Sequence, residues 1–212
     1  MDPLLPLLTA LAAGFLHALE PDHMAAVTTF VARRPRPLRA LGFGLRWGAG
    51  HSVAILVVGI ALIVLDVRIP DGVSRGLEFG VGTLLMALGL WLLWSVLHDR
   101  AHAAAGPGEH PHHHAGGSGW VGVAHGLAGT APLVALLPVA LGGSPLWAGA
   151  YLLVFGVGTV AAMGFYALVA GVVFDRASIH SESLARGIRL ATALASTAIG
   201  VLWMHGAVAS GA

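Results

Sequence analysis

Six apolar segments divide the chain, and each is long enough to cross a lipid bilayer. A spanning helix needs about 20 mainly apolar residues, and 57% of the 212 residues are hydrophobic whereas 10% are charged. We therefore expect an all-α polytopic membrane protein with six transmembrane helices. The predicted spans are, approximately, residues 4–32, 38–65, 76–97, 119–141, 145–174 and 186–209.

Arginine placement predicts how these spans are oriented. Nine arginines fall on one side of a six-helix topology, namely Arg33, Arg34, Arg36, Arg39, Arg46, Arg100, Arg176, Arg186 and Arg189. Only Arg68 and Arg75 fall on the other side. Because basic residues accumulate in cytoplasmic loops, we expect both termini outside a bacterial plasma membrane. The net charge of +1 gives no reason to expect nucleic acid as a partner, and the absence of cysteine excludes disulfides and thiolate metal sites.

Two halves of the chain resemble each other. "WGAGHSVA" from Trp47 aligns without gaps with "FGVGTVAA" from Phe155, at an offset of 108 residues. The same offset aligns "GFLHAL" with "GVAHGL" and pairs His17 with His125. A third match, at an offset of 111, joins "RGLEFGVGTLLMALG" from Arg75 to "RGIRLATALASTAIG" from Arg186. The matches predict an internal duplication, although glycine-rich membrane helices also resemble one another by composition alone.

An odd number of spans in each half determines the symmetry. With three spans per half, the second half enters the membrane from the opposite side, which predicts a 3+3 inverted repeat as in many transporters. We expect residues 1–97 to form the first repeat, 98–118 a cytoplasmic linker and 119–212 the second repeat. The linker is predicted to be disordered. Its four clustered histidines predict metal handling, the alternative being a plain polar linker: His110, His112, His113 and His114.

"HALEPDH", residues 17–23, concentrates ionisable groups inside the first span. In a continuous helix His17 and Glu20 share a face, whereas His17 and His23 do not. Pro21 removes a backbone hydrogen bond and is expected to break the helix near this point. Such a break would allow Asp22 and His23 to fold back beside His17.

The second span supplies a further imidazole at similar depth. His51 lies near the centre of that span and is followed by Ser52. In the second half Thr159 takes the position of His51, and Thr130 takes that of Asp22. We therefore assign Ser52, Thr130, Thr159 and His125 to a secondary pathway, beside a primary set of five groups: His17, Glu20, Asp22, His23 and His51.

The energetic cost of these groups favours a bound cation. An acidic residue at the bilayer centre costs about 2.5–3.5 kcal/mol, and the chain has no lysine to neutralise it. A divalent cation would compensate both carboxylates, and imidazole with carboxylate suits Ni²⁺, Co²⁺, Zn²⁺ or Cu²⁺. The alternative is that the two carboxyl groups are protonated, or cap the broken helix.

Three stretches give the chain a resemblance to a known family. "HALEPDH" matches the H-x4-D-H signature of the nickel/cobalt transporter family, and "WGAGHS", residues 47–52, resembles its second signature. "VAHGLAGTAPL", residues 123–133, is similar to compact nickel permeases associated with urease operons. The resemblance implies a nickel or cobalt permease whose metal pathway includes His17, Asp22, His23 and His51.

These observations predict a transporter rather than an enzyme. We expect uptake of Ni²⁺ or Co²⁺ as substrate, no resident cofactor, and cytoplasmic nickel chaperones or urease or hydrogenase maturation proteins as partners. An efflux permease with the same site is an alternative. A sulfite-type anion exporter would need basic groups at the centre. An intramembrane metalloenzyme would need a His-Glu-x-x-His pair or several of the short His-x-x-His spacings of membrane hydroxylases at helix ends, and the sequence has neither.

Overall fold

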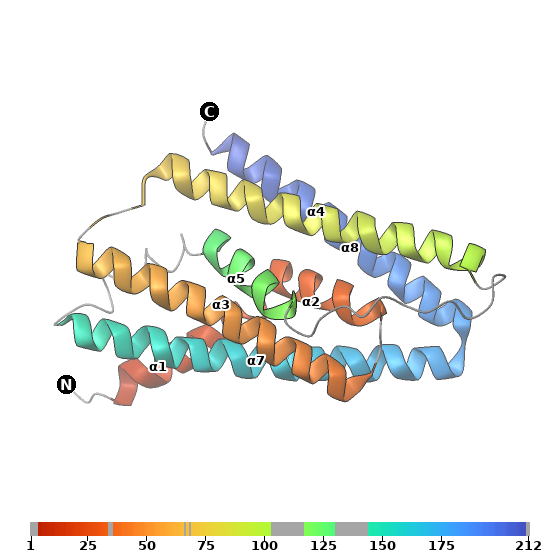
Figure 1. The fold of residues 1–212 in the computed structure, drawn as a ribbon, viewed down its shortest axis with the longest axis horizontal. Coiled ribbons are helices and arrows are strands. Elements are labelled where there is room, and N and C mark those ends of the chain that lie inside the picture. Colours follow the sequence, from red (N-terminus) through yellow and green to blue (C-terminus); the bar gives the residue numbers. More distant parts are fainter. Residues whose placement is uncertain are drawn as a thin grey trace.

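The computed structural model describes residues 4–33, 36–65, 67, 69–102, 117–129 and 144–210, and these residues form helices without any strand. Figure 1 shows their arrangement. The helices are α1 (Leu4–His17), α2 (Pro21–Arg33), α3 (Pro37–Leu65), α4 (Asp71–His102), α5 (Gly117–Ala128), α7 (Pro145–His180) and α8 (Glu182–Ala209).

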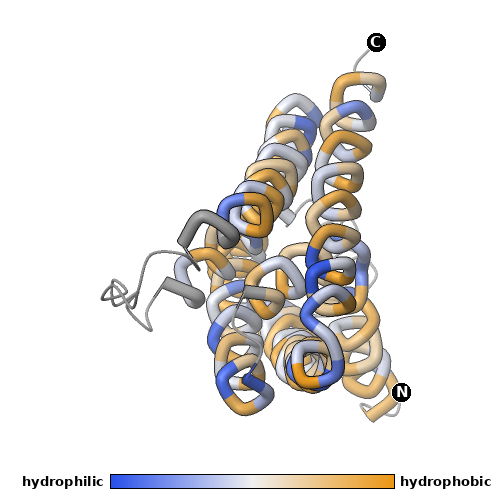
Figure 2. Tube along the Cα trace, turned by 90° about the vertical axis from the view of Figure 1, so that its right-hand side faces the viewer, coloured by the Kyte–Doolittle hydropathy of each residue, from blue (hydrophilic) through white to orange (hydrophobic). Residues whose placement is uncertain are grey.

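Four of these helices are long and apolar enough to cross a membrane: α3, α4, α7 and α8. The helices α1 and α2 pass the same test only together, and they are bent by 55° at the short break between them. The described residues therefore contain four candidate spans, or five if the bent pair is one span. The expected span at residues 119–141 begins with α5, and its remaining part from residue 130 lies outside the described residues. Figure 2 shows how hydrophobic residues predominate along the helices.

Several helices run further than the apolar segments that predict them. The helix α7 has 36 residues, which at 1.5 Å per residue gives a length of about 54 Å, against a hydrocarbon core of about 30 Å. Residues 175–185 contain neither glycine nor proline, so the helix continues beyond its apolar part and only Ser181 separates it from α8. Similarly, α4 continues to His102, into the segment expected to begin the linker at residue 98.

Two antiparallel pairs of long helices, α3 with α7 and α4 with α8, build the bundle (Figure 1). The helix α3 packs along α7 and α4 packs along α8, whereas α1 lies against α7 and α5 against α3. The short helices α2 and α5 lie between the two long pairs (Figure 1). Glycines allow these close approaches, because a Cβ at Gly44 would overlap the carbonyl of Met163 and one at Gly82 would meet the carbonyl of Gly200.

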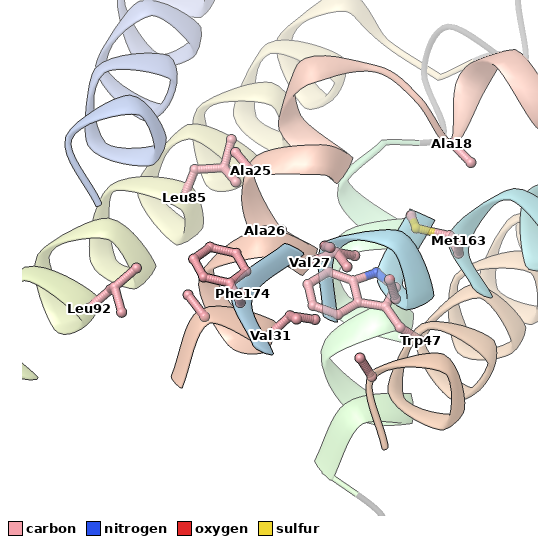
Figure 3. Packing of buried hydrophobic residues seen from close by; sticks show 14 of the residues in the cluster. Ala18, Ala25, Ala26, Val27, Val31, Trp47, Leu85, Leu92, Met163 and Phe174 are labelled. Atoms are coloured by element: carbon pink, nitrogen blue, oxygen red, sulfur yellow. The ribbon is translucent and has the colours of Figure 1, made fainter. Parts of the chain in front are cut away.

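The apolar core surrounds α2. Val27 and Val31 of this helix pack in one cluster with Trp47, Leu85 and Phe174, which come from α3, α4 and α7 (Figure 3). This packing holds α2 in the interior and so determines the position of the polar residues at its start. On the outer faces of α3 and α7 large apolar side chains are exposed, as lipid contact requires: Val53, Val57, Leu153 and Val169.

Candidate metal centre

The break between α1 and α2 brings the polar residues of the first motif together. His17 is the last residue of α1, and its carbonyl accepts a hydrogen bond from the backbone N–H of Glu20 at 3.0 Å. Pro21 begins α2, where a missing N–H costs nothing because the first turn has no acceptor for it. As a result, the ring of His23 turns back to within 4.5 Å of the His17 ring, measured between centroids.

Three imidazoles converge through the same type of ring nitrogen. The Nε2 atom of His51 lies 3.3 Å from Nε2 of His17 and 3.4 Å from Nε2 of His23. A four-coordinate metal with bonds of about 2.0–2.1 Å places neighbouring ligand atoms about 3.3–3.4 Å apart. The spacing of the three Nε2 atoms around His51 therefore fits one transition-metal ion.

Carboxylates contact the outer nitrogens of two of these rings. Nδ1 of His17 lies 3.1 Å from Glu20 Oε1 in an ion-pair contact, and Nδ1 of His23 forms a hydrogen bond of 3.0 Å with Asp22 Oδ1. This arrangement, which is common around bound metals, leaves the Nε2 lone pair directed inward and fixes the ring. Glu20 is half exposed and contacts the edge of His17 opposite His51. The assignment of Glu20 to the metal ligands stays a prediction, and its contact with His17 also places it where it could orient that ring.

Asp22 links this centre to the second half of the chain. Its Oδ2 atom accepts a hydrogen bond from Nε2 of His125, which lies in α5, at 3.1 Å. Asp22, His23 and His125 are all buried and form a second group with metal-ligand spacing. The pairing of His125 with His17 at the 108-residue offset was the only sequence signal for this contact.

The centre combines a buried carboxyl group with buried ring nitrogens that lack a hydrogen-bond partner among the described residues. The side chain of Asp22 is bound by His23 and His125, and no lysine or arginine pairs with it among the described residues. The Nδ1 atoms of His51 and His125 are buried without a hydrogen-bond partner in the same part of the chain. A buried carboxyl group beside ring nitrogens that lack partners is therefore an environment that a cation would stabilise.

The other predicted residues lie at helix contacts or outside the described residues. Ser52 Oγ donates to the carbonyl of Gly156 at 3.2 Å, which joins α3 to α7. Thr159 Oγ1 donates to the carbonyl oxygens of Gly14 and Phe155, each 3.1 Å away. Five predicted residues lie outside the described residues: His110, His112, His113, His114 and Thr130.

Two aromatic residues that sequence reasoning left out pack against the centre. Phe155 lies 5.4 Å from the His17 ring, and Trp47 lies 5.9 Å from the His125 ring, both measured between centroids. These aromatics begin the two aligned segments of the duplication. The sequence could have pointed to both aromatics through their equivalent positions at the 108-residue offset, because the two histidines that they contact are separated by the same offset.

The chain was compared with protein families, with solved structures and with characterised proteins. No family model matches the chain, and no solved structure matches it. The chain is 32% identical to the urease accessory protein UreH of Bacillus sp. (strain TB-90), over 94% of this chain and 92% of that protein.

Two further relatives match over smaller shares of their own length. A protein of Methanocaldococcus jannaschii that carries the description "nickel/cobalt efflux system" is 31% identical over 47% of this chain and 48% of that protein. The chloroplast protein FOR GROWTH AND FERTILITY 2 of Arabidopsis thaliana is 29% identical over 77% of this chain and 46% of that protein. The near full-length match to UreH, together with the "HALEPDH" motif, shows that the chain belongs to the nickel/cobalt transporter family.

Proposed function

We propose that this chain carries Ni²⁺ or Co²⁺ across the bacterial plasma membrane through the centre formed by His17, His23 and His51. The observation that carries this proposal is that the Nε2 atoms of His17 and His23 lie 3.3 and 3.4 Å from Nε2 of His51. Imidazole without thiolate suits these ions. The buried carboxylate of Asp22 adds the negative charge that attracts a dication.

The architecture in this proposal is a 3+3 inverted repeat in which α1 and α2 form one broken span. Reciprocal contacts support it. A Cβ at Gly14 would overlap the carbonyl of Phe155, and a Cβ at Gly122 would overlap the carbonyl of Trp47. At the 108-residue offset, Gly122 is the counterpart of Gly14 and Phe155 is the counterpart of Trp47. Each of the two contacts is therefore the equivalent of the other in the opposite repeat.

Further contacts obey the same exchange. Gly158 meets the carbonyl of Leu11, and their counterparts Gly50 and Gly119 also meet. In α4 and α8 the offset is 111, so Ala193 is the counterpart of Gly82 and Gly200 is the counterpart of Gly89. Gly82 contacts Gly200, and Gly89 contacts Ala193, as the repeat requires. The equivalent helices α3 and α7 run antiparallel, as do α4 and α8 (Figure 1), as expected for two repeats of opposite orientation.

The repeats meet at the metal centre. His17, His23 and His51 belong to residues 1–97, whereas His125 belongs to residues 119–212. A site between inverted repeats can be exposed to either side when one repeat rocks against the other. In our proposal this motion carries the ion past the buried cluster.

Uptake is the direction that we propose. An inside-negative potential contributes about 4.6 kcal/mol per 100 mV for a divalent ion, since one charge is worth about 2.3 kcal/mol. The topology that we propose places both termini outside and the histidine-rich residues 98–118 in the cytoplasm, where nickel chaperones or urease or hydrogenase maturation proteins would receive the ion. Efflux is the second candidate, because one relative carries that description.

Metal accumulation in cells tests this proposal. We expect cells that express the chain to accumulate more radioactive nickel than control cells, and excess cobalt to compete. His51→Ala would abolish the difference, whereas His205→Ala, an exposed position near the end of α8, would preserve it. Accumulation below the control would indicate efflux, and accumulation equal to the control for both metals would refute transport.

A further inference from the structure

We infer that the centre contains a second, sequential metal position formed by Asp22, His23 and His125, and that His125 is the ligand through which the ion leaves the first position. This inference rests on the proposed transport. The three residues each offer a ligand atom, and these atoms lie within 4.8 Å of one another. In particular, Asp22 lies 3.0 Å from His23 Nδ1 through Oδ1 and 3.1 Å from His125 Nε2 through Oδ2.

His23 belongs to both positions but uses opposite ring nitrogens. Its Nε2 atom faces His51, whereas its Nδ1 atom faces Asp22. A neutral imidazole offers one lone pair at a time. A metal on Nε2 requires the ring proton on Nδ1, and a metal on Nδ1 requires it on Nε2, so the two positions exclude each other and are filled in turn. Each transfer of the ion from one side of the ring to the other therefore returns the ring proton to the nitrogen that the ion has left.

Exposure differs between the two positions. At the first position the His17 side chain is 10% exposed and its partner Glu20 is 48% exposed. At the second position the side chain of Asp22 is 4% exposed and that of His125 is 0% exposed. In this conformation an ion reaches the first position along Glu20 and His17, and the second position is closed.

The repeat explains why His125 completes the second position. His17 and His125 are counterparts at the 108-residue offset. His17 packs against Phe155 and His125 packs against Trp47, and these two aromatic residues are themselves counterparts at the same offset. The counterpart histidines His17 and His125 therefore both lie beside the ring of His23, with centroid distances of 4.5 and 4.6 Å.

An unsatisfied nitrogen distinguishes His125 from a purely structural residue. Its Nδ1 atom is fully buried and has no hydrogen-bond partner among the described residues. A buried polar atom without a partner destabilises the fold. Among the described residues the ring makes one hydrogen bond, to Asp22, and is otherwise held by packing against His23 and Trp47.

Purified full-length protein and Co²⁺ provide the test, because the visible absorption of Co²⁺ reports its ligands. We would measure Co²⁺ affinity and spectrum in detergent, and Co²⁺ flux into vesicles containing the protein. We expect His17→Ala to lose both affinity and flux. His125→Ala should reduce flux at least about tenfold, in the range found when a residue of a metal site is removed, while affinity and spectrum at the first position are retained.

His125→Gln separates ligation from positioning. The glutamine amide can still donate to Asp22 but offers no ring nitrogen, so we expect the same loss of flux as for His125→Ala. Full flux in His125→Gln would show that the residue only holds Asp22, and would overturn the inference. Affinity lost in parallel with His17→Ala would also overturn it, since both histidines would then belong to one site.

Two further measurements keep these outcomes separate. His205→Ala is the matched control, and we expect it to retain wild-type affinity, spectrum and flux. If the unaltered protein moves neither Co²⁺ nor Ni²⁺, the proposed function itself fails. In contrast, normal flux in the unaltered protein and in both His125 variants refutes only the second position.

Discussion

His17 and His51 face each other through Nε2 atoms that are 3.3 Å apart, although they lie in α1 and α3. The contact depends on the break that ends α1 at His17 and on the glycine packing that holds α1 and α3 against α7. Two uncharged imidazoles gain at most one hydrogen bond from this arrangement. A metal ion between the two rings could bind both Nε2 atoms, so this arrangement is more favourable with a metal ion bound than without one.

Removing either of these rings should weaken metal binding strongly. We expect His17→Ala and His51→Ala each to lower Ni²⁺ affinity at least about tenfold, as a lost ligand outweighs the 10–100-fold effect of an outer partner. Titration calorimetry of the purified protein measures this. The double variant should be little worse than either single one, because one site is already broken. Unchanged affinity in His51→Ala would contradict the three-imidazole site.

Glu20 should act through His17 rather than on the metal. Its Oε1 atom lies 3.1 Å from His17 Nδ1. Glu20→Gln keeps an oxygen acceptor, so we expect affinity within a few-fold of wild type, whereas Glu20→Ala should reduce it about tenfold. Calorimetry with both variants distinguishes the roles. A loss in Glu20→Gln as large as that in His17→Ala would instead make Glu20 a direct ligand.

The sequence predicted the residues of the first position, but not how they are joined. The spacing of His17, Pro21 and His23, and the central place of His51, pointed to one cluster. The contact of His125 with Asp22 joins residues 103 positions apart, and helical periodicity does not specify how two helices rotate against each other. That rotation is set by pairs such as Gly14 with Phe155, whose significance appears only when the helices are packed.

The ends of the long helices were missed for a different reason. The predicted spans ended where the apolar residues ended, so residues 175–185 were expected to form a loop. Backbone hydrogen bonding does not require an apolar side chain, and a helix continues through polar residues until a residue breaks or caps it. Here Ser181, with an extended backbone, ends α7 and accepts from the N–H of Leu184 at 3.4 Å to begin α8.

Alanine at the reciprocal glycines should destabilise the fold equally. A Cβ at Gly14 or at Gly122 would overlap a backbone carbonyl, so a helix must shift. We expect each substitution to reduce the free energy of unfolding by about 1–3 kcal/mol, the usual cost of overpacking. Gly149→Ala is the control, because its Cβ would meet nothing within 4 Å. Thermal unfolding in detergent tests this, and equal midpoints for Gly14→Ala and Gly149→Ala would contradict the packing.

Metal should stabilise the folded protein through the same site. A ligand at 100 times its Kd stabilises the state that binds it by about 2.7 kcal/mol. We therefore expect Ni²⁺ to raise the unfolding temperature, a chelator to reverse the rise, and His51→Ala to abolish it. Mg²⁺, which prefers oxygen ligands, serves as the control ion. An equal rise with Mg²⁺ would indicate a nonspecific effect of charge.

Cysteine labelling should place the two equivalent connections on opposite sides of the membrane. The chain contains no cysteine, so Val67→Cys, after α3, and His180→Cys, at the end of α7, each introduce one thiol. Both positions are exposed. In the proposed inverted repeat, a membrane-impermeant maleimide added to intact cells labels Val67→Cys, whereas His180→Cys is labelled only after the membrane is opened.

The pattern of labelling decides how the second half enters the bilayer. Between Val67 and His180 the chain includes α4, α5 and α7. If the segment that begins with α5 crosses the membrane, three crossings separate the two thiols and they lie on opposite sides. If this segment instead enters and leaves on one side, only α4 and α7 cross, and both thiols react in intact cells. Labelling of both would therefore refute the inverted repeat, even if metal transport were demonstrated.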